Sequence, residues 1–78
     1  MDIIEKVKIY YEREYNNLLN GLENYDWMKS DPHPIIWQLM GEFCAISMFV
    51  QDLGVAFNDI NPIYKNYCEK FRDLLLTF

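Results

Sequence analysis

The stretch that most constrains the fold of this chain runs from Ile35 to Leu53, because thirteen of its nineteen side chains are apolar. On a helix with ~100° per residue, the apolar side chains cover an arc of about 220°. Such a helix must be covered by other segments on most sides, and the chain before and after it supplies them. The densest part of the arc is formed by Ile35, Ile36, Leu39, Phe43, Ile46, Val50 and Leu53.

The N-terminal third shows a single apolar stripe at helical spacing. Asp2 followed by Glu5 is the pattern of a capping box at a helix start. We therefore predict a helix over residues 2–22, with residue 27 as its furthest end. The stripe consists of Ile4, Val7, Tyr11, Tyr15, Leu18 and Leu22.

Prolines and a glycine divide the rest of the chain. Pro32 and Pro34 disfavour helix at the residues before them, so the central helix is predicted over 35–53, capped by Ser30 or Asp31. Gly54 is suited to end that helix. Asn61 and Pro62 read as the cap and first residue of a third helix over 61–77, with Phe57 tucked in before it.

No period-two strand pattern and no internal repeat occur in the 78 residues. Short connections between three helices favour antiparallel neighbours. The sequence thus predicts an all-α fold, a three-helix up-down-up bundle that forms one domain over residues 1–78. A core of this size is marginal, so self-association would help to stabilise it.

The charge balance argues against several classes of partner. Twelve acidic and seven basic residues give a net charge of −5, interspersed along the chain, which is unsuited to phosphate backbones or anionic membranes. Glu42, Gln51 and Asp52 would be costly inside a bilayer, and the N-terminus lacks the pattern of a secretory signal. Cys44 and Cys68 lie on apolar faces and are expected to be free thiols. We expect a cytoplasmic protein with neither a nucleic-acid nor a membrane partner.

The sequence offers little for catalysis. His33 is the only histidine, and there is no glycine-rich phosphate loop, nucleophile elbow or metal-binding motif. We expect no enzyme activity and no catalytic, cofactor-binding or metal-binding residues.

The central helix carries more apolar surface than two neighbouring helices need. The excess consists chiefly of Trp37, Met40, Cys44 and Met48. Such a patch marks an interaction site, and its commonest solution is a C2 homodimer. Tyr10 and Tyr11 cannot both be equally buried on one helix, so one of them is a second interface candidate.

These features favour a small protein–protein interaction module, a homodimeric adaptor or an inhibitor, with itself and a further protein as partners. One alternative is a helix-turn-helix-like DNA-binding regulator, with Leu53-Gly54-Val55 in the turn and residues 61–72 as the reading helix. That helix would offer Lys65 and Arg72 but also Glu69 and Asp73. A second alternative is a structural subunit of a larger assembly.

Residue usage is rich in Ile, Asn, Tyr and Lys and poor in Ala and Gly. In size, acidity and helical form the chain resembles small acidic accessory proteins of bacterial phages and mobile elements. The resemblance is one of general character, without a motif. It implies that the chain binds and inhibits, or regulates, a host or phage protein such as a defence component.

Overall fold

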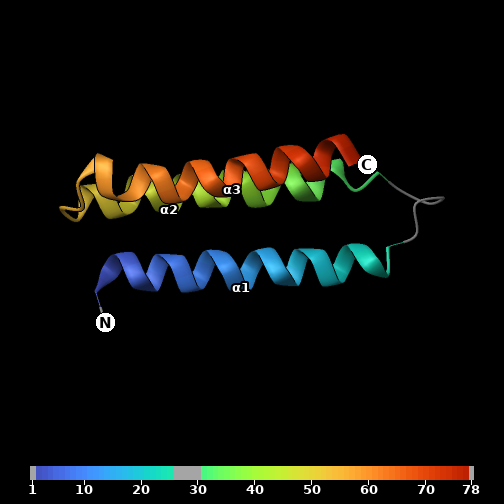
Figure 1. The fold of residues 1–78 in the computed structure, drawn as a ribbon, viewed down its shortest axis with the longest axis horizontal. Helices are drawn as coiled ribbons and strands as arrows, with labels where there is room; N and C mark the ends of the chain where they lie inside the picture. The colour runs from blue at the N-terminus through green and yellow to red at the C-terminus, as the bar shows by residue number, and fades with distance from the viewer. Residues whose placement is uncertain (1, 26–30, 78) are drawn as a thin grey trace.

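The computed structural model describes residues 2–25 and 31–77, which form three long helices and no strand. α1 spans Ile3–Glu23, α2 spans His33–Asp52 and α3 spans Phe57–Thr77. In Figure 1 the chain runs out along α1, back along α2 and out again along α3. This arrangement confirms the predicted all-α, up-down-up bundle.

The first helix begins as the sequence predicts. The Oδ1 atom of Asp2 accepts a hydrogen bond from the backbone N–H of Glu5 at 2.8 Å, which satisfies a free donor of the first turn. α1 ends at Glu23 and does not reach residue 27. α2 begins two residues before the predicted start, and its N-cap is Pro32 rather than the predicted Asp31. Asp31 instead accepts a hydrogen bond from the N–H of His33 at 2.9 Å from just before the helix. Ser30, the other predicted cap, lies outside the described residues.

The turn between α2 and α3 is a Schellman motif. Gly54 has a φ of +105°, a conformation that favours glycine. Its N–H donates to the carbonyl of Gln51, and the N–H of Val55 donates to the carbonyl of Val50, both at 3.0 Å. The predicted role of Gly54 as the residue that ends α2 is confirmed.

The predicted start of the third helix is wrong by four residues. α3 begins at Phe57, and Pro62 lies inside it. The extra turn carries Ile60, which is fully buried, and this burial offsets the backbone hydrogen bond that a proline cannot make. Phe57 itself is exposed rather than tucked in.

Aromatic rings hold the three helices together. The Tyr11 ring of α1 stacks on the Phe43 ring of α2 with centroids 4.0 Å apart, and Phe43 meets Tyr67 and Phe71 of α3 edge to face at 5.5 and 5.2 Å. These large rings separate α1 from the other two helices, whereas α2 and α3 approach each other more closely (Figure 1). The molecule is therefore a close α2–α3 hairpin with α1 packed alongside it. The rings of Tyr11, Phe43, Tyr67 and Phe71 lie between α1 and this hairpin.

Candidate functional site

The most unusual surface of the molecule is one side of α2, which we call the outer face. Its residues are all exposed, and they lie opposite the buried Ile36, Phe43 and Val50 on the same helix. Neither α1 nor α3 covers it. The outer face consists of Trp37, Gln38, Gly41, Ala45, Met48, Phe49 and Asp52.

Three of these side chains are large and apolar. Trp37, Met48 and Phe49 are 57%, 62% and 61% exposed. Asp52 is the charged residue among the seven, and the exposed Glu42 borders the outer face beside Phe49. Gly41 and Ala45 lie between the large apolar side chains, and no atom lies within 4 Å of the position that a Cβ of Gly41 would occupy. The middle of the outer face therefore carries only small, uncharged side chains, and large apolar side chains lie on either side of it.

The predicted interface residues of α2 divide into two pairs. Trp37 and Met48 are on the outer face, while Met40 and Cys44 are half-buried. The hydroxyl of Tyr64 on α3 interacts with the thiols of Cys68 and Cys44, and these hydrogen bonds together with burial raise the pKa of Tyr64. Cys44 and Cys68 are free thiols, as expected. Met40 packs against the core, so Met40 and Cys44 belong to the border with α3.

The two candidate tyrosines of α1 also separate. Tyr11 is fully buried, and its hydroxyl donates a 2.6 Å hydrogen bond to the carbonyl of Phe43, so it lies in the core rather than on a surface. Burial raises the pKa of the Tyr11 hydroxyl above its ordinary value. Tyr10 is half-buried beside Phe43, with the guanidinium of Arg13 5.3 Å from the centroid of its ring.

Sequence reasoning named none of Phe49, Gly41 and Ala45 as interface residues. The available signal was their position: at ~100° per residue Gly41 and Ala45 lie opposite Phe43, between Trp37 and Gln38, and Phe49 lies next to Gln38, about 120° from Phe43. Ile35 and Leu53, assigned to the dense apolar face, are exposed at the two ends of α2. The core therefore uses a narrower part of α2 than its apolar arc suggests.

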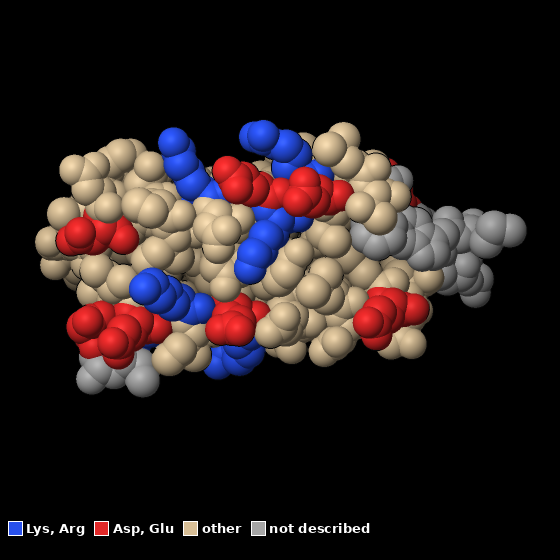
Figure 2. All heavy atoms as spheres, in the orientation of Figure 1, with Lys and Arg blue, Asp and Glu red and all other residues tan. Residues whose placement is uncertain are grey.

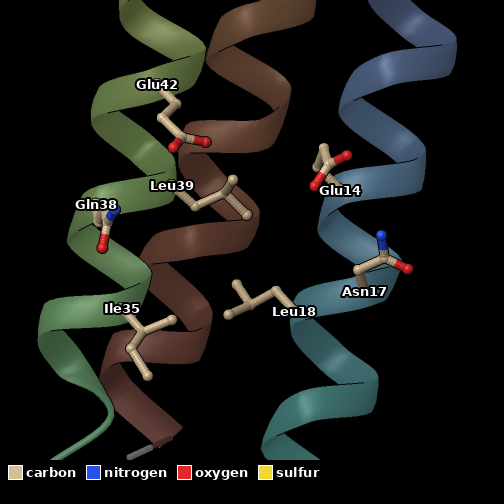
Figure 3. A pocket seen from close by; sticks show the side chains of 7 residues that line it. All are labelled: Glu14, Asn17, Leu18, Ile35, Gln38, Leu39 and Glu42. Carbon is tan, nitrogen blue, oxygen red and sulfur yellow. The ribbon is translucent and has the colours of Figure 1, made fainter.

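An open cleft of about 300 Å³ separates α1 from α2 on another side. In Figure 3, Leu18 and Leu39 extend toward each other across it, with Glu14 and Glu42 farther along the two helices. Glu14 also pairs with Arg13, at 3.3 Å between Oε1 and Nε. The cleft is an open groove with an apolar floor, and its two carboxylates are too few to form a metal site.

The Asp31–His33 pair is also too small to form a metal site. Its Oδ1 and Nδ1 atoms are 3.5 Å apart, and the Nε2 atom of His33 is buried without a hydrogen-bond partner among the described residues. Within residues 2–25 and 31–77, no three His, Cys, Asp or Glu side chains are grouped to hold a metal ion.

The remaining surface is mixed in charge. Figure 2 shows acidic and basic side chains interspersed over α3 and α1 on the side turned to the viewer. A nucleic-acid surface would instead gather basic residues on one face. In the described part of the chain, no helix has the length and hydropathy needed to cross a bilayer.

Comparison of the chain with protein-family models, with curated proteins and with solved structures gives no match. Its function has therefore to be inferred from its own surfaces, of which the outer face of α2 is the most distinctive.

Proposed function

We propose that the chain is a small protein-binding module, an adaptor or an inhibitor, that acts through the outer face of α2. One observation carries the proposal: Trp37, Met48 and Phe49 are each more than half exposed, on a face whose charged residues are Asp52 at one end and Glu42 at its edge. Contiguous exposed apolar surface on a small chain is unfavourable in water unless a partner covers it. Tryptophan and methionine are also enriched where proteins meet.

The form of the molecule supports binding over catalysis. Three long helices joined by short connections provide surfaces, and the clefts described between α1 and α2 and between α1 and α3 are both open to solvent. Together with the general resemblance to small acidic accessory proteins of phages and mobile elements, this favours a protein that regulates or inhibits another by contact. We place such an activity in the cytoplasm.

The experiment is a capture assay with matched variants. The immobilised chain, its Trp37→Glu and Met48→Glu variants and a Leu76→Glu control are each exposed to a bacterial lysate, and bound proteins are identified by mass spectrometry. Leu76 is an apolar residue on α3 that is 80% exposed, so the control adds the same charge away from the outer face.

We expect proteins that bind the unaltered chain and the Leu76→Glu control but not the two outer-face variants. Circular dichroism establishes that all four chains are folded. If every variant retains the same proteins, or if none retains any, the proposal is contradicted. Salt-sensitive binding to duplex DNA in a parallel assay would support a DNA-binding regulator instead.

A further inference from the structure

We infer that the outer face of α2 binds the outer face of a second copy of this chain, with the two α2 helices antiparallel and crossing at Gly41 and Ala45. This inference rests on the proposed function and names the partner. It is drawn from the spacing of the residues along α2, from the position of Asp52 and from the area that the face offers.

The spacing makes the outer face complementary to itself. The midpoint of α2 lies between residues 42 and 43, and Gly41 and Ala45 lie on either side of it. In an antiparallel overlap centred there, Trp37 of each copy lies opposite Met48 of the other, and Gly41 of each copy lies within about one residue of the position opposite Ala45 of the other, next to the crossing. In a C2 interface each contact occurs twice in this reciprocal way.

The sizes of the side chains also fit a crossing of two α2 helices at Gly41 and Ala45. Helix axes approach closely only where the residues at the crossing are small, and the space beside Gly41 is open. Away from the crossing the helices diverge, and there Trp37 can extend over the flexible Met48 side chain of the second copy, a favourable sulfur–aromatic contact. Small residues therefore lie where the backbones meet and large ones where they separate.

The position of Asp52 also favours the antiparallel direction. Asp52 lies at the C-terminal end of α2, so an antiparallel partner brings the partial positive charge of its helix N-terminus toward that carboxylate. The N–H groups of His33, Ile35 and Ile36 there are already bonded to Asp31 and Pro32, so this attraction comes from the helix dipole alone. A parallel pair would bring the two Asp52 carboxylates together.

The area is that of a weak, reversible contact. With about 200 Å² for a large side chain, the exposed parts of Trp37, Met48 and Phe49 amount to roughly 700 Å² over two copies. Interfaces below about 1,200 Å² are typical of transient complexes. We therefore expect a reversible dimer at micromolar concentration.

The first test uses two glycines in matching surroundings. Gly41 and Gly21 are both exposed, both helical, and both have open space where a Cβ would lie. Gly41→Glu puts an unpaired charge at the crossing, whereas Gly21→Glu adds the same charge to α1. In sedimentation equilibrium at about 0.15 M salt, where repulsion between the net charges is largely screened, we expect Gly41→Glu to weaken dimerisation by about tenfold or more and Gly21→Glu to leave it nearly unchanged. Equal effects of the two variants would overturn the inference.

The second test measures the register by cross-linking. Gly41→Cys and Ala45→Cys are made separately in a chain carrying Cys44→Ala and Cys68→Ala, whose fold is checked by circular dichroism. We expect a disulfide-linked dimer mainly when the two chains are mixed, with one of each identified by mass. Cross-linking of each chain alone would indicate a parallel pair, and the absence of any cross-link would indicate no contact here; either result overturns the inference.

The outcomes separate this inference from the proposed function. A monomer at micromolar concentration, or a species larger than a dimer, contradicts the α2–α2 pair. If Trp37→Glu and Met48→Glu still abolish capture of another protein by that monomer, the proposed function remains while the second copy is excluded as its partner.

Discussion

At the residue scale, Tyr11 does the most to define the bundle. It is fully buried, stacks on Phe43 and donates its hydroxyl hydrogen to the Phe43 carbonyl, so one side chain ties α1 to α2 by packing and by a polar contact. A buried tyrosine needs such a partner because its hydroxyl is removed from water. The sequence identified Tyr11 as part of an apolar stripe but could not identify the acceptor, which lies 32 residues away.

Removing the Tyr11 hydroxyl should destabilise the fold modestly. We expect Tyr11→Phe to lower the free energy of unfolding by about 1 kcal/mol, since the stacking remains while the hydrogen bond is lost. Urea unfolding followed by circular dichroism measures this change. Tyr10→Phe is the control, because Tyr10 is only half-buried; a larger loss in the control would contradict the assigned role.

The same hydroxyl predicts a pH dependence. Burial raises the pKa of Tyr11 above 10.0, its value in the unfolded chain, so below pH 10 both states keep the proton and stability does not change. Above pH 10 the unfolded chain loses the proton first, and the free energy of unfolding should fall by up to about 1.4 kcal/mol per pH unit for this group. The pKa values of Tyr15, Tyr64 and Tyr67 are also raised, so the unaltered chain should lose stability more steeply.

Urea unfolding at a series of pH values tests this expectation. Tyr11→Phe should show a shallower decline above pH 10 than the unaltered chain. An identical slope in both proteins would show that Tyr11 keeps its ordinary pKa in the fold.

At the scale of the elements, the sequence predicted what depends on local chemistry. Asp2 and Gly54 mark helix ends through their own side chain or backbone, and both act as expected. The start of α3 was predicted wrongly because Asn61-Pro62 is a strong local signal for a helix start. Tertiary packing overrides this signal, since Ile60 is fully buried in a helix that begins earlier, at Phe57. The outer face was only half predicted, because which side of an apolar helix remains uncovered depends on where its neighbours lie.

Replacing Pro62 tests whether packing holds a proline inside α3 at a cost in stability. Pro62→Ala supplies an N–H for the carbonyl of Asn58 and removes the proline ring from the helix interior, so we expect an increase in stability of about 1 kcal/mol or more. The control is Pro34→Ala in the first turn of α2, where an N–H has no helical partner. Thermal unfolding compares the two, and a similar gain from both would contradict this account of α3.

Two glycines should respond to the same substitution in opposite directions. Gly54→Ala forces a Cβ into the positive-φ conformation and should cost about 1–2 kcal/mol. Gly21→Ala removes a flexible residue from α1, where the space is open, and should add about 0.5 kcal/mol. Thermal unfolding of both variants tests the sign, and a stabilised Gly54→Ala variant would refute the Schellman turn.

At the scale of the whole molecule, two opposing features set the conditions for association. The exposed apolar side chains of the outer face of α2 favour contact between copies, whereas a net charge of −5 on each chain opposes it. Two such charges about 20 Å apart repel by roughly 5 kcal/mol in unscreened water. Salt with a Debye length of about 10 Å at 0.1 M removes much of that repulsion.

Dimerisation should therefore strengthen with salt. We expect the dissociation constant from sedimentation equilibrium to fall several-fold or more as sodium chloride is raised from low to moderate concentration, because screening the net repulsion outweighs screening the contact at Asp52. A DNA-binding regulator would respond in the opposite direction, since salt weakens contacts to phosphate. The Gly21→Glu variant, with a net charge of −6, should show a steeper salt dependence than the unaltered chain. If the dissociation constant instead rises with salt, attraction between charged groups holds the copies together, and an apolar contact between two α2 helices is the wrong description of the assembly.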